Sequence, residues 1–316
     1  MNIVLFPGLG LEFELNRVAF KLGGLEIYWY GVIIAVGFVL AVLYGCYRAT
    51  GFGVDQDKLL DLLYVAAPAA IIGTRVYYVV FNLELFKTGG KLDWAKVIDI
   101  RDGGLAIYGG IIAAILTAAI YCKIRKQSFW SYTDCAAYGF LIGQMIGRWG
   151  NFMNVEAYGS VTELPWRMCS AKIARELLAE GQIAADVYSQ IVDGTLGVHP
   201  TFFYESLWNF IGFILLILLF RKGRKFDGQV FLSYAIWYGA GRTVIEGLRT
   251  DSLYLFGSGL RISQLVGILS VIGAVVLYVI FLKMGKPVTP PIVKNSKKNT
   301  EEEISAEGEH DGSNQD

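Results

Sequence analysis

The stretch IIAVGFVLAVLYG (residues 33–45) carries no charged side chain and lies inside a longer apolar segment, residues 27–47. A helix needs roughly 20 such residues to cross the hydrocarbon core of a bilayer. A second stretch, GFLIGQMIG (residues 139–147), is also rich in glycine, and glycines let membrane helices approach one another closely. Both stretches therefore predict membrane-spanning helices that pack against other helices.

The rest of the 316-residue chain has the same character, since 54% of all residues are hydrophobic and only 18% are charged. Such a composition is typical of polytopic membrane proteins. The formal net charge of zero gives no reason to expect nucleic-acid binding. We predict an all-α polytopic membrane protein with about seven transmembrane helices, near residues 27–47, 59–81, 104–122, 135–153, 200–220, 228–247 and 262–282.

Basic residues cluster on one side of this predicted bundle. KIRK (residues 123–126) follows the third segment, RKGRK (residues 221–225) follows the fifth, and further lysines follow the seventh. Loops rich in Lys and Arg remain in the cytoplasm. We therefore expect the N-terminus outside and the C-terminus inside.

Three regions outside the helices have a distinct composition. Residues 1–26 predict an outer N-terminal arm, in which LEFELNRVAF favours a short strand or an interfacial segment. Residues 155–198 contain amphipathic helical patterns and predict a small outer cap within the transmembrane domain, residues 27–286. Residues 287–316, rich in Pro, Lys and Glu, predict a disordered cytoplasmic tail.

Three arginines, Arg75, Arg148 and Arg242, fall inside the predicted helices. Each would cost at least about 2.5 kcal/mol at a helix centre that faces lipid, so these side chains should face the bundle interior. Arg75 could contact a ligand, or it could pair with Asp134 or Glu84. Asp134 directly precedes the fourth segment, and we expect it to cap the N-terminus of that helix.

The sixth segment ends in a charged pattern. Tyr238, Arg242, Glu246 and Arg249 follow the spacing i, i+4, i+8 and i+11, which places them on one face of a helix. One interpretation is an ion-pair network that only holds the bundle together. The other is a binding site for an anion, because guanidinium groups bind phosphate in a bidentate manner.

Arg148, Asn151 and Asn154 step along one side of the fourth segment near its outer end. With the predicted topology, this group and the charged end of the sixth segment approach the same leaflet. Two arginine-bearing helix ends in one leaflet indicate a receptor for an anion held in lipid, such as a phospholipid headgroup.

Five motifs in this order resemble those of the prolipoprotein diacylglyceryl transferase family. The resemblance covers residues 26–282, and its most specific part is GRWGNFMNVEAYG, which matches the family signature G-R-x-G-N-F-x-N-x-E-x-x-G. The motifs are WYG (29–31), DGGLAIYGG (102–110), GRWGNFMNVEAYG (147–159), HPTFFYE (199–205), and Tyr238 with RTVIEGLRTD (242–251).

The resemblance implies an enzyme of the bacterial plasma (inner) membrane that performs the first step of lipoprotein maturation. It would move the diacylglyceryl group of phosphatidylglycerol onto the lipobox cysteine of a lipoprotein precursor and release glycerol phosphate. Arg148 and Arg242 match family positions regarded as essential and would bind the phosphate. The four cysteines show no metal-ligand spacing and are interpreted as apolar fillers, and no metal or cofactor is expected.

Further residues complete the expected lipid site. The asparagines would donate amide hydrogens to headgroup oxygens, the glutamates and the third arginine would orient the phosphate-binding arginines, and the tyrosines would place hydroxyls at interfacial depth. The predicted site for phosphatidylglycerol comprises Tyr30, Arg148, Asn151, Asn154, Glu156, Gly159, Tyr238, Arg242, Glu246 and Arg249.

The group that activates the thiol is left open. A free cysteine is mostly protonated at neutral pH, and many family members carry His at the position of Tyr108. A tyrosine hydroxyl, with a reference pKa of about 10, is a poor base. We predict that Tyr108 contacts the glycerol or phosphate; an ordinary core aromatic is the alternative. His199 is either a base or a simple helix-start residue, and nearby arginines could ionise the thiol without any base.

Two other functions fit intramembrane arginines. A transporter or flippase of an anionic lipid would move its substrate without consuming it. A non-catalytic lipid-binding scaffold would only bind it.

Overall fold

The computed structural model describes residues 2–100, 103–250 and 261–292. Within these ranges seven helices have 18 residues or more, and each overlaps one predicted segment. They are α1 (Trp29–Ala49), α2 (Gln56–Phe81), α4 (Ile107–Ile124), α5 (Phe129–Asn154), α8 (Thr201–Leu219), α9 (Gln229–Glu246) and α10 (Ile262–Lys283). The prediction of a helical, multi-pass membrane protein is confirmed.

Five of these helices, namely all but α5 and α9, are apolar and long enough to cross a membrane. The two exceptions carry the polar residues of the interior, among them Asp134 and Arg148 on α5 and Arg242 on α9. Their lower hydropathy follows from that content. The count of seven crossings therefore stays a prediction.

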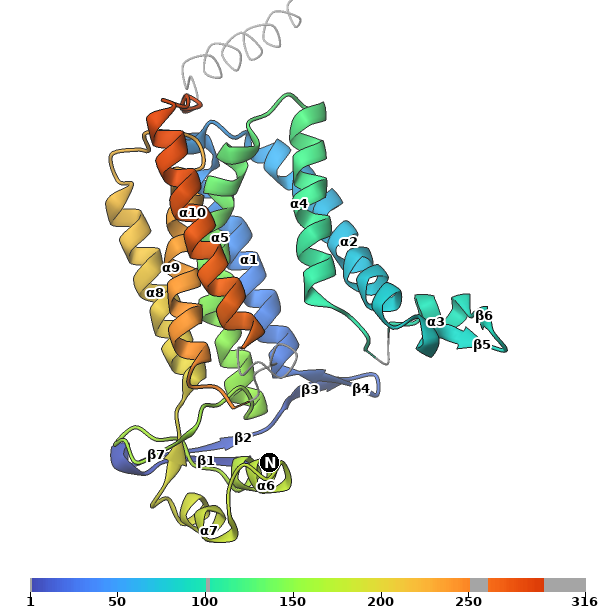
Figure 1. Ribbon diagram of the computed structural model, residues 1–316, viewed down its shortest axis with the longest axis vertical. Coiled ribbons are helices and arrows are strands. Elements are labelled where there is room, and N and C mark those ends of the chain that lie inside the picture. The colour runs from blue at the N-terminus through green and yellow to red at the C-terminus, as the bar shows by residue number, and fades with distance from the viewer. Residues whose placement is uncertain (1, 101–102, 251–260, 293–316) are drawn as a thin grey trace, which may run out of the picture.

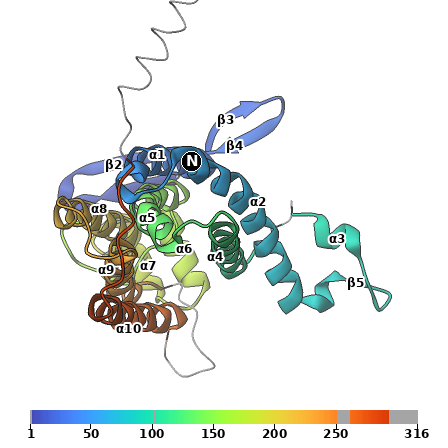
Figure 2. The same cartoon turned by 90° about the horizontal axis from the view of Figure 1, so that it is seen from above.

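Helix α5 lies at the centre of the bundle and packs against α1, α8 and α9, while α10 covers α9 (Figure 1). Helices α2 and α4 pack on each other and form a separate pair to one side, as the view from above also shows (Figure 2). The two helices of this pair approach closely. A Cβ atom added at Gly109 would lie only 2.2 Å from the Gly73 carbonyl oxygen.

One end of the bundle carries a small cap (Figure 1). Two antiparallel hairpins precede α1, which confirms the strand expected in the N-terminal arm. The buried side chains of Val4, Ile173 and Ile191 belong to one core, so the first hairpin packs against the cap helices. The elements are β1 (Asn2–Phe6), β2 (Leu11–Leu15), β3 (Val18–Leu22), β4 (Leu25–Tyr28), β7 (Val161–Thr162), α6 (Ala171–Ala179), α7 (Ala185–Asp193) and β8 (Gly197–Val198). We call this end the cap end.

Short elements fill the remaining connections. A small projection follows α2 and leads into α4, and three 3-10 helices lie in the first third of the chain. They are η1 (Pro7–Leu9), η2 (Thr50–Phe52), η3 (Leu83–Phe86), β5 (Lys87–Thr88), β6 (Lys91–Leu92) and α3 (Trp94–Ile98).

The opposite end, which we call the tail end, corrects the predicted role of Asp134. Helix α5 begins earlier than predicted, and the side chain of Ser128 caps it. Asp134 is fully buried and accepts the backbone N–H groups of Gly228 and Phe231, each at 2.8 Å. It therefore caps α9 and not its own helix, with Arg224 Nε at 3.2 Å.

The tail end also holds the chain after α10. Asp227 accepts hydrogen bonds from the backbone N–H and the hydroxyl of Thr289, and the Ile292 N–H donates to the Thr50 carbonyl at 2.9 Å. The predicted disorder from residue 287 therefore does not hold for residues 287–292, while residues 293–316 lie outside the described residues. Burial acts to raise the pKa of Asp227, but its hydrogen bonds with Thr289, Arg224 and Ser128 outweigh that effect and lower the pKa to about 2.

Candidate active site

One buried carboxylate, Glu205 on α8, joins three arginines. Its side chain is 4% exposed, and Arg148 Nη2 lies 2.5 Å from Glu205 Oε2. Arg242 Nη1 lies 3.1 Å and Arg249 Nη1 3.5 Å from Glu205 Oε1. These arginines come from α5, from α9 and from the turn directly after α9, so one carboxylate on α8 joins α5 to the end of α9.

A second buried carboxylate, Glu246, completes what we call the arginine cluster: Arg148, Glu205, Arg242, Glu246 and Arg249. Arg242 Nη2 lies 2.8 Å from Glu246 Oε2, and Arg249 Nε lies 4.0 Å from it. Glu246 thus forms ion pairs with Arg242 and Arg249, one of the two interpretations of the charged pattern, while the anion site stays a prediction. Among the residues that the structure describes, three guanidinium groups thus surround two carboxylates.

Two of these guanidinium groups can be reached by a ligand. The side chains of Arg148 and Arg242 are 20% and 21% exposed, whereas Glu205 and Glu246 are almost completely buried. The carboxylates lie behind the guanidinium groups and orient them. Such a preorganised cationic surface, at the end of membrane helices, suits an anion that arrives from the lipid.

Glu156 is linked to Arg148 through Asn151, and its role in orienting the arginines stays a prediction. It accepts the side-chain amides of Asn151 at 3.0 Å and Asn154 at 3.2 Å. Asn151 in turn accepts a hydrogen bond from Arg148 Nη1 at 3.4 Å. Glu156 therefore acts on the cluster through an asparagine.

The local backbone explains the position of Glu156. Val155 (φ 52°) and Ala157 (φ 57°) both have left-handed conformations, which are unfavourable for residues with a Cβ atom, above all for valine. This strained turn after α5 folds Glu156 back over the last helical turn, where its backbone N–H donates to the Asn151 carbonyl at 3.1 Å. Strain of this kind concentrates at functional sites.

Gly159 has a packing role. An added Cβ atom would lie 2.7 Å from the Cβ of His199 and 2.9 Å from the Leu248 carbonyl oxygen. Gly159 also forms an isolated β-bridge with Arg249. The absence of a side chain at this signature position lets the chain approach the turn that carries Arg249.

The predicted tyrosines flank the cluster on two helices. Tyr30 packs against Gly150, where a Cβ atom would lie 2.9 Å from the tyrosine ring, two residues after Arg148. Tyr238 stacks on Tyr234, with ring centroids 5.7 Å apart, one helical turn before Arg242. The Tyr30 ring therefore lies against the turn of α5 that follows Arg148, and Tyr238 lies one turn before Arg242 on α9.

The two candidate groups for thiol activation lie outside the cluster's hydrogen bonds. His199 Nδ1 lies 3.3 Å from the hydroxyl of Tyr204, which also accepts Trp166 Nε1 at 2.7 Å. Burial lowers the pKa of the His199 imidazole below its usual range, which favours the neutral form of the ring. Tyr108, the second residue of α4, is 45% exposed.

Arg75 forms neither of its predicted ion pairs, because Glu84 pairs with Lys87 at 2.5 Å and Asp134 lies at the tail end. The guanidinium group of Arg75 donates instead to backbone carbonyls of the segment before α4, those of Lys96, Val97, Asp99, Gly103 and Gly104. Asp102 and Asp251, at the edges of two motifs, lie outside the described residues.

Glu205 was missing from the predicted site, although HPTFFYE contains it. A carboxylate in the middle of an apolar segment raises the same question as an intramembrane arginine, so the signal was present. Arg261 was also missed. Its guanidinium group donates to the backbone carbonyl of Glu246.

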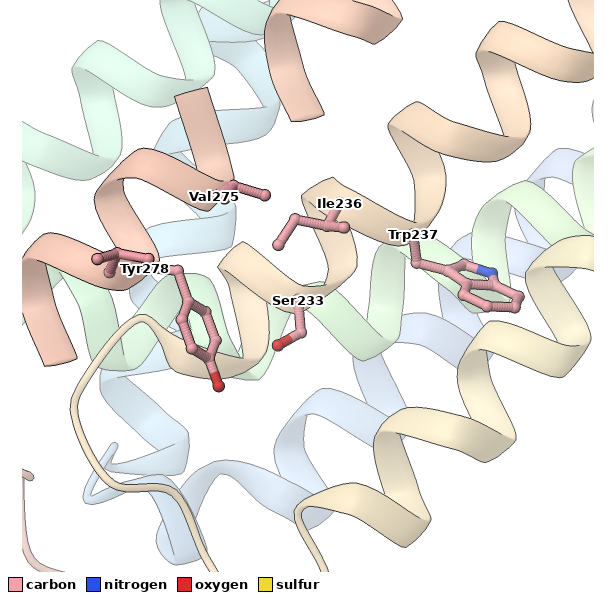
Figure 3. A pocket seen from close by; sticks show the side chains of 6 residues that line it. Ser233, Ile236, Trp237, Val275 and Tyr278 are labelled. Carbon is pink, nitrogen blue, oxygen red and sulfur yellow. The ribbon is translucent and has the colours of Figure 1, made fainter. Parts of the chain in front are cut away.

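Two apolar hollows lie near these helices. One, of about 520 Å³, is lined by Phe13, Trp149, Phe152 and Phe202 among others, so it borders the turns of α5 that also carry Arg148. The other, of about 300 Å³, lies between α9 and α10 and contains no residue of the arginine cluster (Figure 3).

This architecture defines a multi-pass membrane protein with a buried cationic site at one end of its helices. The sequence pattern of the prolipoprotein diacylglyceryl transferases matches residues 17–280, and the chain belongs to that family. It is 41% identical over 278 residues to the phosphatidylglycerol–prolipoprotein diacylglyceryl transferases of Bacillus cereus (strain G9842) and Bacillus mycoides (strain KBAB4). The Bacillus anthracis (strain CDC 684 / NRRL 3495) enzyme matches equally, and each alignment covers 88% of this chain and 96% of the relative.

Proposed function

We propose that this chain transfers the diacylglyceryl group of phosphatidylglycerol to the lipobox cysteine of lipoprotein precursors and that the arginine cluster is its active site. The names of the relatives support the two substrates. The observation that carries the site assignment is the pair of partly exposed guanidinium groups, Arg148 and Arg242, that the buried Glu205 holds together within the membrane helices.

The proposed reaction explains this charge. The thiolate sulfur attacks the glycerol carbon that bears the phosphate ester, the C–S bond forms, and the C–O bond breaks. Glycerol phosphate leaves with the electron pair of that bond, so negative charge grows on the departing phosphate oxygen. Arg148 and Arg242 stabilise this charge, which preorganised donors in a water-poor site do far better than water.

The carboxylates keep the arginines in position before the substrate arrives. Glu205 contacts all three guanidinium groups, and Glu246 contacts Arg242 and Arg249. Donors that are already fixed need little reorganisation in the transition state. The same arginines lower the energy of the incoming thiolate, and Tyr108 contributes a hydroxyl to the glycerol or phosphate.

The enzyme resides in the bacterial plasma membrane, with the cap end outside and the tail end in the cytoplasm. The two basic connections, residues 123–126 and 221–225, follow α4 and α8 at the end opposite the cap (Figure 1), which agrees with the positive-inside tendency. Single cysteines in a cysteine-free protein test this: position 180 should react with an impermeant reagent in intact cells, and position 222 should not. Labelling of position 222 would overturn the orientation.

The activity is tested with purified protein, phosphatidylglycerol and a peptide that contains a lipobox cysteine. We expect a diacylglyceryl peptide and an equal amount of glycerol phosphate, and no product with the Cys→Ser peptide. Transbilayer movement of intact lipid without product would indicate a transporter. Binding without product or movement would indicate a scaffold, and either outcome would refute the proposed function.

A further inference from the structure

Arg75 uses its entire set of hydrogen-bond donors on one stretch of backbone. A guanidinium group has five N–H donors. Nε donates to the Val97 carbonyl at 2.8 Å, and Nη1 donates to the carbonyls of Gly103 at 2.9 Å and Gly104 at 2.8 Å. Nη2 donates to the carbonyls of Lys96 and Asp99. With five acceptors for five donors, Arg75 has no N–H left for a lipid phosphate.

The neighbouring residues lock the same segment onto α2. The Ala106 N–H donates to the Thr74 carbonyl at 3.1 Å. A Cβ atom at Gly104 would lie 2.5 Å from Arg75 Nη1, and one at Gly109 would lie 2.2 Å from the Gly73 carbonyl oxygen. Residues 104–109 therefore fit against α2 in a single register.

Tyr108 lies within this locked segment. Helix α4 makes most of its contacts with α2 and few with α5, so α2 is the main support that fixes where the start of α4 points. A change in the contact between Arg75 and the Gly103–Gly104 carbonyls should therefore move the phenol ring.

We propose that Arg75 is a positioning residue that holds Tyr108 at the lipid site through the backbone carbonyls of residues 96, 97, 99, 103 and 104. This inference rests on the proposed function and on the proposed contact of Tyr108 with the substrate. Lysine cannot replace Arg75, because a single ammonium group cannot reach five carbonyls arranged around a planar fork.

A double-mutant cycle tests the link between the two residues, because coupled residues show non-additive effects. We expect Arg75→Lys to lower kcat by about tenfold in the wild-type background and by less than about twofold in the Tyr108→Phe background. Arg167 provides a matched control, since it also donates to carbonyls, those of Glu163, Leu164 and Gly194, but in the cap. Arg167→Lys should have the same effect in both backgrounds.

A second readout needs no activity. In a cysteine-free protein that carries Tyr108→Cys, Arg75→Lys should change the alkylation rate at position 108 several-fold, and Arg167→Lys should leave it unchanged. If Arg75→Lys does not fold, Gly104→Ala, which would displace the guanidinium group, replaces it in both experiments. Equal losses of kcat in both backgrounds, or an unchanged alkylation rate, would overturn the inference. A wild-type protein without transferase activity would refute the proposed function instead, and the alkylation result would still decide the position of residue 108.

Discussion

The two ends of the bundle each contain a buried group of charged side chains. The two groups differ in how far their guanidinium groups are exposed. At the cap end, three arginines face Glu205 and Glu246, and two of the guanidinium groups remain about one-fifth exposed. At the tail end, Arg224 faces Asp134 and Asp227, and its side chain is only 3% exposed. Within the described residues, the cap end thus has two guanidinium groups that a ligand can reach, whereas the tail end has one enclosed guanidinium group between two carboxylates.

The two carboxylates of the tail end already have their partners within the protein. Asp134 accepts two backbone N–H groups, and Asp227 accepts Ser128, Ser131, Arg224 and Thr289. Buried carboxylates saturated in this way hold a structure together. The comparison teaches that intramembrane charge alone does not identify a site. A site is indicated where a ligand can still reach the charged side chains.

The largest effect is expected at the two partly exposed arginines of the cap end. Arg148→Ala and Arg242→Ala should abolish transfer, a loss of at least roughly a thousandfold, because even one neutral donor to a developing charge is worth about 100- to 1000-fold. The Lys variants should remain badly impaired, since lysine cannot bind phosphate in a bidentate manner. Turnover per folded molecule is the measurement, with the exposed Arg221→Ala as control. Near-wild-type turnover in folded Arg242→Ala would remove Arg242 from the mechanism.

The tail end should respond in stability and not in chemistry. Asp134→Ala leaves Arg224 without one of its buried partners and should cost about 3 kcal/mol, seen as a lower melting temperature with unchanged kcat per folded molecule. Asp61→Ala serves as control, because Asp61 forms only an exposed pair with Arg125 at 3.9 Å. A large loss of kcat at unchanged stability would place the tail end in the mechanism.

Acid should weaken the same end. The pKa of Asp227 is lowered from 3.8 to about 2 in the folded state, so the stability it contributes is present above about pH 4 and is lost as the pH falls towards 2. That contribution amounts to about 2 kcal/mol. Melting temperatures between pH 4.5 and 2.5 should therefore fall more steeply for the wild type than for Asp227→Asn. Parallel curves would show that Asp227 does not act in this way.

The smallest effect concerns Tyr108. If its hydroxyl contacts the glycerol or phosphate, Tyr108→Phe should lose about tenfold in kcat, the value of one hydrogen bond. Tyr108→His should retain much of the activity, because an imidazole also donates a hydrogen bond. Because Tyr108 would not act as the base, the pH–rate profiles of the wild type and of Tyr108→Phe should then have the same limbs. Full activity of folded Tyr108→Phe would shift attention to His199.

The helices and one half of the cluster could be predicted from the sequence. Apolar length predicts spans, and the spacing of Arg242, Glu246 and Arg249 predicts contacts along one helix face, because both depend on local geometry. Glu205 could have been flagged by its apolar surroundings, but its three partners lie far away in sequence. No local pattern reports such a contact.

The errors have a common physical cause. The sequence predicts that Asp134 caps its own helix and that Arg75 contacts a ligand or pairs with a carboxylate, because local caps and opposite charges are the partners that a sequence makes visible. Both side chains bind backbone groups of other segments instead. Backbone N–H and C=O groups occur at every residue, so these partners leave no trace in the sequence.

The central claim is that Arg148 and Arg242 of the arginine cluster bind a lipid phosphate. Equilibrium binding tests this claim most directly. Affinities of the purified protein for phosphatidylglycerol and for a diacylglycerol with the same acyl chains would be compared in neutral-lipid nanodiscs. We predict that the wild type prefers the phospholipid and that Arg148→Gln and Arg242→Gln each lose at least about 1.4 kcal/mol of this preference, or tenfold in relative affinity. A folded Arg148→Gln/Arg242→Gln protein with the wild-type preference would contradict the account.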